Sequence, residues 1–213
     1  CISPGGISHN IKESILPLGD FNVYNATAAL ACAYLFGISE EKLADALADF
    51  PPVRGRMERI YAGDFDVIVD YAHTPDALGK AVSALREVYD GRIITLFGCG
   101  GDRDKTKRPE MAQVAEKYAD RIFVTSDNSR TEKTEDILDD IRKGFSQKGL
   151  AKALFISDRK EAIRTAITLA PEGAVILLAG KGHETYQIIG TEHLHFDERE
   201  IVEEVFKSME EQI

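Results

Sequence analysis

From residue 67 onward, short apolar runs rich in β-branched residues alternate with segments whose apolar side chains recur at helical spacing. The apolar runs contain almost no polar residue, which is typical of strands that are covered on both faces of a sheet. We expect strands at 67–69, 93–97, 122–125, 154–156 and 175–179. We expect helices at 75–89, 108–119, 134–148 and 158–170. This alternation predicts an α/β domain with a doubly wound, mostly parallel sheet.

The end of the chain follows a different pattern. Two short strands at 186–189 and 193–196 are close enough to form a hairpin, and a final helix is expected over 197–211. In a doubly wound sheet, ligands bind outside the carboxyl ends of the strands. The loops that follow those ends are therefore the places to look for chemistry. They are 70–76, 98–106, 126–132 and 180–184.

The first quarter of the chain predicts a separate helical unit. The first twenty or so residues show no clear period and are interpreted as a strand or loop remnant. An alanine-rich segment at 25–36 predicts a buried helix, and Ser39 is placed to cap a second one. Paired prolines in the segment 50–56 indicate a stiff linker. We therefore expect one unit over residues 1–53 and another over 54–213.

Composition excludes several classes of protein. Of the 213 residues, 44% are hydrophobic and 29% are charged, which is ordinary for a soluble globular chain and excludes disorder, collagen and a coiled-coil rod. No apolar run approaches the ~18 residues that span a bilayer. The net charge of −10 has the wrong sign for binding a phosphate backbone. We therefore expect no nucleic-acid partner and no membrane partner.

The cysteines and the first residue bear on cellular context. Cys1, Cys32 and Cys99 form neither a disulfide framework nor a CxxC pair. Since no signal peptide is visible, a cytoplasmic protein is expected. The chain opens with Cys1 instead of Met, which suggests a fragment of a longer protein.

A glycine-rich loop at 98–106 resembles a phosphate loop but lacks its key positions. A Walker A motif has Gly before its Lys-Thr pair, where this chain has Asp104, and a dinucleotide fingerprint has a third Gly where this chain has Arg103. Two carboxylates, Asp102 and Asp104, would repel a phosphate. The mixed charges suit a zwitterionic ligand, and a solvated turn with a charge cluster is the alternative.

Two further loops carry charges of both signs. In Asp127-Asn128-Ser129-Arg130, Arg130 can bind a carboxylate through two parallel hydrogen bonds, and Asp127 can pair with an ammonium group. Glu184, in the loop 180–184, adds another anion. An Asx-type turn that leads into the helix at Thr134 is the structural alternative. Convergence of these charges at three adjacent strand ends favours a binding site.

The loop after the first strand of the α/β unit has a structural part and a candidate functional part. Thr74 is placed to cap the next helix, with Pro75 at its first position. Asp70 is a candidate to bind a ribose hydroxyl or a metal, and His73 is a candidate to bind a phosphate. Arg54 and Arg56 in the linker are candidates for a nucleotide between domains, and solvated surface charges are the alternative.

Taken together, these motifs resemble those of the Mur ligases of peptidoglycan synthesis. The resemblance implies three domains, of which this chain would supply the end of the central ATP-binding domain and the complete Rossmann-like C-terminal domain. The motifs are Phe21-Asn22-Val23-Tyr24-Asn25-Ala26, Gly55-Arg56-Met57-Glu58, Asp70-Tyr71-Ala72-His73-Thr74-Pro75, Gly98-Cys99-Gly100-Gly101-Asp102-Arg103-Asp104 and Gly180-Lys181-Gly182-His183-Glu184.

Within the family, the motifs are most similar to those of the ligase that adds the third amino acid to UDP-N-acetylmuramoyl-L-alanyl-D-glutamate. The resemblance implies that ATP phosphorylates the terminal carboxyl of this UDP-linked dipeptide and that an incoming amine then displaces phosphate. It implies that meso-diaminopimelate is the incoming amino acid, since Arg130 matches a distal carboxylate that lysine lacks. The implied ATP contacts are Asn22, Asn25, Arg56, Asp70 and His73. The implied diaminopimelate contacts are Arg103, Asp127, Asn128, Ser129, Arg130, Gly180 and Glu184, with Ser129 replacing the proline of the family's Asp-Asn-Pro-Arg motif.

The chain lacks a Gly-Lys-Thr phosphate loop and recognisable magnesium ligands. The resemblance therefore places the catalytic residues and the Mg²⁺ site upstream of Cys1, with none in this chain, and predicts that the chain alone is inactive. A monomeric, cytoplasmic full-length enzyme is expected. The alternatives are a lysine-adding homologue and a non-catalytic module that binds an amino acid or a nucleotide. A dehydrogenase is excluded because the glycine fingerprint is missing.

Overall fold

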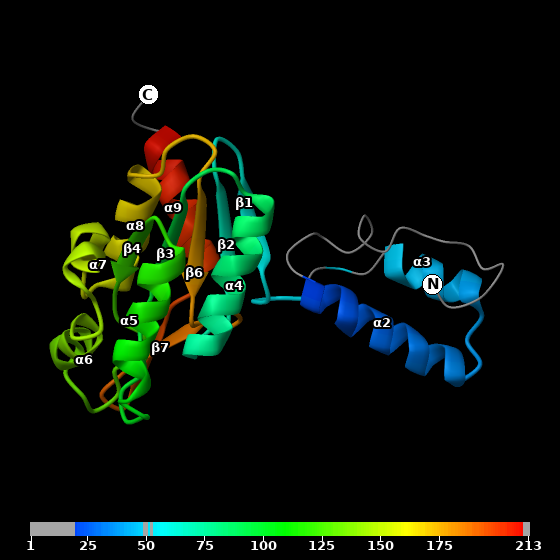
Figure 1. Ribbon diagram of the computed structural model, residues 1–213, viewed down its shortest axis with the longest axis horizontal. Coiled ribbons are helices and arrows are strands. Elements are labelled where there is room, and N and C mark those ends of the chain that lie inside the picture. The colour runs from blue at the N-terminus through cyan, green and yellow to red at the C-terminus, as the bar shows by residue number, and fades with distance from the viewer. Residues whose placement is uncertain (1–19, 49–50, 52, 211–213) are drawn as a thin grey trace. The chain divides into compact units, whose positions relative to one another are not determined.

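The computed structural model describes residues 20–48, 51 and 53–210, so the remnant expected over the first twenty or so residues lies almost entirely outside the described part. The chain divides into two compact units, Cys1–Pro52 and Val53–Ile213 (Figure 1). The division falls at the predicted linker. No helix within the described ranges is long and apolar enough to cross a bilayer.

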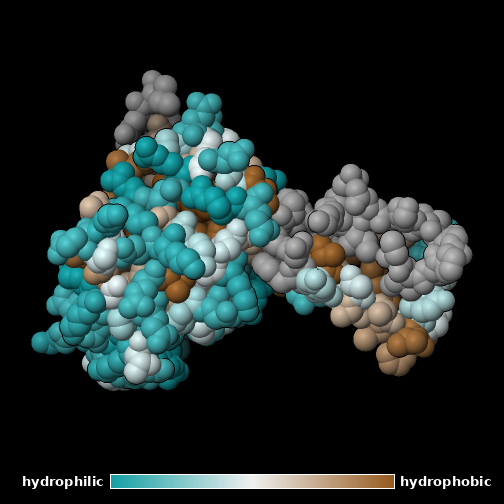
Figure 2. Space-filling view, viewed as in Figure 1, coloured by the Kyte–Doolittle hydropathy of each residue, from teal (hydrophilic) through white to brown (hydrophobic). Residues whose placement is uncertain are grey.

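The first unit contains two helices, α2 (Asp20–Leu35) and α3 (Glu40–Ala48). Helix α3 begins directly after Ser39, as predicted. The prediction that the alanine-rich helix is buried is wrong for this chain, because every described side chain from Val23 to Leu35 is half-buried or exposed. Its apolar residues lie on all sides, and Figure 2 shows apolar surface along it. A helix of this kind needs neighbours all round, and α3 is the one described helix that packs on it within this unit.

The second unit is built on a six-stranded sheet that confirms the predicted α/β class. The sheet order is β1-β2-β6-β3-β4-β5; β1 pairs with β2 in the antiparallel sense and the remaining pairs are parallel. The strands are β1 (Glu58–Ala62), β2 (Asp66–Asp70), β3 (Ile93–Phe97), β4 (Arg121–Val124), β5 (Ala153–Phe155) and β6 (Val175–Ala179).

Helices cover both faces of this sheet (Figure 1). Helices α4 (Pro75–Val88) and α5 (Lys107–Tyr118) pack side by side over one face, with α6 (Thr134–Arg142) against α5. Helices α8 (Arg159–Thr168) and α9 (Glu198–Glu210) share the core on the other face with alternate strand residues such as Val67, Val69 and Leu96. Every residue of β3 and β6 is buried, as the unbroken apolar runs predicted. Thr74 and Pro75 begin α4 as expected, since the Thr74 side chain accepts a hydrogen bond from the Ala77 amide at 3.2 Å.

Two elements differ from the prediction. The helix expected over 134–148 is interrupted: α6 ends at Arg142, and a shorter helix, α7 (Gln147–Lys152), begins after Ser146. After the end of α6 the chain packs closely on α5, since a Cβ on Gly144 would lie 2.1 Å from the carbonyl oxygen of Pro109. Strand β1 was not predicted at all. The hairpin is confirmed as a separate sheet of β7 (Tyr186–Ile189) and β8 (Glu192–His195).

A buried ion pair fastens the helices of one face to the sheet. The side chains of Arg159 and Glu198, the first residues of α8 and α9, are 0% and 1% exposed and approach to 2.8 Å. The same guanidinium donates from Nη1 to the Ser126 carbonyl at 3.2 Å and from Nη2 to the Ala179 carbonyl at 2.9 Å. Arg159 therefore holds the carboxyl ends of β4 and β6 in place.

The substitution Glu198→Ala is expected to lower the free energy of unfolding by about 3–5 kcal/mol, because it leaves the Arg159 charge buried without its partner. Urea denaturation followed by circular dichroism measures the change. Glu204→Ala is the matched control on the same helix, since Glu204 is exposed and pairs with an exposed Lys160. A midpoint shift that is equally small for both variants would contradict the structural role of the pair.

Candidate functional site

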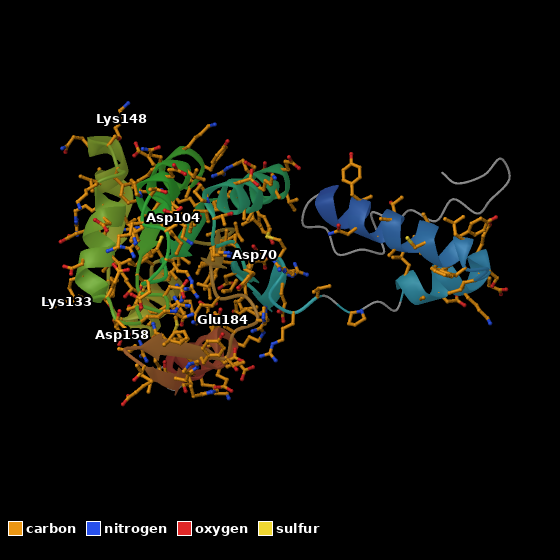
Figure 3. The ribbon with its side chains drawn as sticks, turned by 90° about the horizontal axis from the view of Figure 1, so that it is seen from below. Asp70, Asp104, Lys133, Lys148, Asp158 and Glu184 are labelled. Atoms are coloured by element: carbon orange, nitrogen blue, oxygen red, sulfur yellow. The ribbon has the colours of Figure 1, made fainter. Side chains whose placement is uncertain are left out.

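Four loops leave the sheet at one edge, because β6 pairs in parallel with both β2 and β3, and β3 pairs with β4. They follow the carboxyl ends of β2, β6, β3 and β4. Figure 3 looks onto this edge, where Asp70, Asp104 and Glu184 are labelled. The main-chain amide of Gly180 donates to the Asp70 carbonyl at 3.0 Å, which joins the first two loops directly. The predicted site residues of the α/β unit therefore share one edge.

A buried ammonium group lies at the centre of this edge. The Lys181 side chain is 0% exposed, and its Nζ lies 3.2 Å from Glu184 Oε2, 3.3 Å from Asn128 Oδ1 and 3.9 Å from Asp127 Oδ1. The rings of Tyr186 and Phe196 lie 5.8 Å and 5.6 Å from the same nitrogen. The sequence analysis gave Lys181 no role. The signals that mark it are a glycine on each side and a glutamate three positions later.

Asn128 connects three segments of the edge. Its Nδ2 donates to Glu184 Oε2 at 3.0 Å, and its Oδ1 accepts from the main-chain amide of Ile188 at 2.9 Å. The side chain of Gln187 donates to Ser126 Oγ and to the Asp127 carbonyl, both at 2.9 Å. The loop after β4, the loop after β6 and strand β7 are therefore held together by side-chain amides.

Arg130 extends from the same loop with part of its guanidinium free. Its Nη1 donates to the carbonyl oxygens of Gly101 at 3.0 Å and Asn128 at 3.3 Å. Among the described residues, its Nε and Nη2 have no hydrogen-bond partner. The backbone has a left-handed φ of 51° and is fixed on both sides by the hairpin, through the Ile188 carbonyl and the Gly190 amide. The side chain is thus positioned and retains donors for an anion.

The side chain of Ser129 is directed toward helix α6. Its side chain is buried, and its Oγ lies 2.7 Å from the hydroxyl of Thr134, the first residue of α6. The structure therefore assigns the Ser129 hydroxyl to the start of that helix. The predicted contacts Asp127, Asn128, Gly180 and Glu184 lie together, with Arg130 beside Asn128.

The glycine-rich loop after β3 uses its two aspartates internally. Asp102 accepts hydrogen bonds from the amide and hydroxyl of Thr131, at 3.2 Å and 2.8 Å. Asp104 accepts from the amide and hydroxyl of Thr106, at 2.9 Å and 2.6 Å. Both carboxylates therefore hold the loop in shape. Arg103 is exposed and donates to the Asp102 carbonyl at 3.2 Å.

A charge cluster that the sequence analysis missed stabilises this loop. Glu132 accepts two hydrogen bonds from Arg108, at 2.9 Å and 3.1 Å, and pairs with Lys105 at 2.8 Å. Its Oε1 also accepts from the main-chain amide of Asp102 at 2.7 Å. The hydrogen bonds from Arg108 and Lys105 lower the pKa of Glu132 to about 2. The cluster fixes the loop after β4 to the loop that carries Arg103.

A second set of candidate residues lies at the β2 side of the edge. The Asp70 carboxylate is 9% exposed and accepts from the amides of Met57 and Ala72, each at 2.8 Å. Burial raises the pKa of Asp70, and the two amides oppose that shift. Gly55 packs against the loop after β6, since a Cβ on Gly55 would lie 2.3 Å from the main-chain nitrogen of His183. Asp70 therefore anchors residues 55–58 to the edge.

Exposed cationic and aromatic groups surround Tyr71 next to this anchor. The Arg56 guanidinium lies 5.0 Å from the Tyr71 ring centre, and the rings of His73 and His183 lie 4.7 Å and 5.3 Å from it. We call these four residues the Tyr71 patch. Of the predicted ATP contacts, the structure brings together Arg56, Asp70 and His73. Asn25 lies exposed in the other unit, and Asn22 is in the same helix α2.

The residues of this edge do not fit a metal ion. Within residues 20–48 and 53–210, no three or more His, Cys, Asp or Glu side chains are grouped so that they could hold one. Both oxygens of Asp70, the predicted candidate, already accept main-chain hydrogen bonds. No magnesium chemistry is therefore assigned to the described residues.

Comparison with known proteins gives the family. The Mur ligase, glutamate ligase domain, matches residues 55–182. The chain belongs to this family. A UDP-N-acetylmuramoyl-L-alanyl-D-glutamate--2,6-diaminopimelate ligase of Fusobacterium nucleatum subsp. nucleatum is 50% identical over 193 residues, which is 90% of this chain and 39% of that protein. The chain thus spans about two fifths of the length of this curated relative.

Solved structures agree with the family and the fold. The structure of a ligase with the same printed name is 39% identical and superposes with a TM-score of 0.73, over 91% of this chain and 39% of that one. The Escherichia coli FolC structure in complex with ADP is 20% identical, with a TM-score of 0.61 over 92% of this chain and 41% of that one. The latter shows the fold alone.

Because the pKa of Glu132 is lowered, the unfolded chain binds its proton at higher pH than the folded chain does. The contribution of Glu132 to stability is therefore present above its ordinary value of 4.5 and is lost as the pH falls toward about 2. A carboxyl-detected NMR titration of the folded protein should give Glu132 a midpoint near 2, and Glu132→Gln should flatten the pH dependence of the urea midpoint in this window. A Glu132 midpoint near 4.5 would contradict the cluster.

Proposed function

We propose that this chain is the C-terminal part of an ATP-dependent ligase that adds meso-diaminopimelate to UDP-N-acetylmuramoyl-L-alanyl-D-glutamate. In this proposal residues 1–53 end the ATP-binding domain, and residues 54–213 form the domain that recognises the incoming amino acid. The names of the relatives that are 50% and 39% identical support the substrate assignment.

The observation that carries the proposal is the placement of Arg130 beside Asn128, whose side chain donates to Glu184. The far end of meso-diaminopimelate carries both a carboxylate and an ammonium group. The free donors of Arg130 suit the carboxylate, and the carboxylates of Glu184 and Asp127 suit the ammonium. Arg103, which is exposed at the neighbouring strand end, supplies a second cation for a carboxylate.

Lysine is disfavoured as the substrate on the same grounds. Its side chain ends in an ammonium group alone, so Arg130 would keep unpaired donors next to a second positive charge. Leaving polar groups of a site unpaired discriminates strongly against the analogue that lacks the matching group.

In the proposed reaction, ATP converts the carboxyl of the UDP-linked dipeptide to an acyl phosphate, and the amine of diaminopimelate displaces phosphate to form the amide. This chain's residues bind and orient the amine. The Tyr71 patch presents Arg56 and His73 toward a nucleotide anion, with Asn22 and Asn25 assigned near the adenine.

Other parts of the proposal concern the whole enzyme. The phosphate loop and the Mg²⁺ ligands are assigned to a part of the ligase outside this chain, so the 213 residues alone have no ligase activity. We propose a cytoplasmic, monomeric enzyme that has neither nucleic acid nor a membrane as a partner. Measurable amide formation by the isolated chain would contradict the assignment of catalysis elsewhere.

The substitution Arg130→Met in the full-length ligase is expected to raise the KM for meso-diaminopimelate about 10- to 100-fold, because a hydrogen-bonded charge pair contributes roughly 1.5–3 kcal/mol. Phosphate release at saturating ATP and UDP-linked dipeptide measures the change, with kcat affected less than KM. Arg92→Met is the matched control, since Arg92 is exposed at the opposite edge of the sheet, just before β3.

Two results would contradict the proposed function. One is a wild-type enzyme that uses lysine as well as it uses meso-diaminopimelate. The other is an Arg130→Met variant whose KM equals that of Arg92→Met.

A further inference from the structure

Lys181 is the one fully buried charge at the centre of the candidate site, and the proposed reaction gives it no task. Because its side chain is 0% exposed, it cannot touch a ligand that enters from solvent. A buried ammonium group is tolerated only when it is paired and hydrogen-bonded. Here Asn128 and Glu184 accept its hydrogen bonds and Asp127 lies 3.9 Å away, and Asp127 and Glu184 are also the residues that are proposed to bind the substrate's ammonium.

Lys181 fixes the orientation of the groups that face the ligand. Its Nζ and the Ile188 amide both donate to Asn128 Oδ1, at 3.3 Å and 2.9 Å. With its oxygen held in this way, Asn128 must direct its Nδ2 toward Glu184 Oε2, which lies 3.0 Å away. Glu184 Oε2 is thus held by Lys181 and Asn128 together, and Oε1 is left for a ligand.

Lys181 also sets the charge balance of the site. Asp127 and Glu184 contribute two negative charges, while Lys181 and Arg130 contribute two positive ones. These four groups together are therefore neutral, which matches a ligand end that is itself a neutral zwitterion, while Arg103 on the neighbouring loop is left for the other carboxylate of the ligand. Without Lys181 the same groups would carry one net negative charge, and a ligand end with a lone ammonium would be favoured.

We infer that Lys181 is a positioning residue that gives the site its preference for a zwitterionic amino-acid end over a lone ammonium. It does so by orienting Asn128 and Glu184 and by neutralising one of the two carboxylates. This inference rests on the proposed function and deepens it, because it assigns the choice between diaminopimelate and lysine to a residue that contacts neither.

The test compares kcat/KM for meso-diaminopimelate and for lysine in the full-length ligase. Lys181→Met is expected to lower the value for meso-diaminopimelate about 10- to 100-fold, mainly through KM, and to raise the ratio of lysine to diaminopimelate use at least about tenfold. Lys181→Arg, which keeps the charge, is expected to retain the wild-type ratio. Lys160→Met is the control, since Lys160 is exposed on α8.

A charge-balanced double variant separates the effect of charge on the substrate ratio from the effect of a change in structure. Lys181→Met combined with Asp127→Asn removes one charge of each sign, so the ratio should return to within about threefold of wild type even though both substrates bind more weakly. If Lys181→Met alone does not fold, a folded double variant with the wild-type ratio still supports the inference. A double variant that does not fold either would assign Lys181 a purely structural role and overturn it.

The remaining outcomes distinguish the two levels of the proposal. If Lys181→Met folds and keeps the wild-type ratio, the inference is overturned while the proposed function stands. If the wild-type enzyme itself does not prefer meso-diaminopimelate, the proposed function fails, and the inference fails with it.

Discussion

Strand β6 pairs in parallel with two neighbours at once, and this double pairing decides where every candidate residue of the α/β unit lies. Its five residues are fully buried, and its register sets Ala179 opposite Asp70. The chain therefore leaves β2, β6 and β3 at one level, and β4 follows because it pairs with β3. Arg159 reinforces the arrangement through the carbonyl groups of Ala179 and Ser126, the residues that lead into Gly180 and Asp127.

This arrangement explains why one edge holds so many ionised groups without a large net charge. The loop after β4 and the loop after β6 each carry a carboxylate and a cation, and the buried Lys181 is satisfied by Glu184 of its own loop and by Asn128 of the loop after β4. A site in which Asp127, Glu184, Lys181 and Arg130 balance in charge, and in which Arg130 keeps unpaired donors, is suited to a ligand end that brings a charge of each sign. The Tyr71 patch, which is exposed and cationic, suits an anion instead. The edge therefore has two chemically distinct parts.

The sequence predicted the features that depend on local pattern. The apolar runs of β3 and β6 located the central strands, and the position of Asp127, Arg130 and Glu184 after strand ends predicted that they share one edge of the sheet. The pattern could not reveal β1, an edge strand of half-exposed residues next to the linker, or the break between α6 and α7, where the chain passes close to Pro109 of α5. Lys181 was missed because the hairpin residue Tyr186 and Phe196, which follows the hairpin, lie against it. Arg159 was missed because its partner is distant in sequence. Glu198, for example, is 39 residues from Arg159.

We propose that the carboxyl edge of this sheet is matched to an amino-acid end that carries both a carboxylate and an ammonium group. Calorimetric titration of the full-length ligase, loaded with an unreactive ATP analogue and the UDP-linked dipeptide, tests it most directly. We expect that meso-diaminopimelate binds and that lysine binds at least about tenfold more weakly. Equal affinities, or tighter binding of lysine, would contradict it.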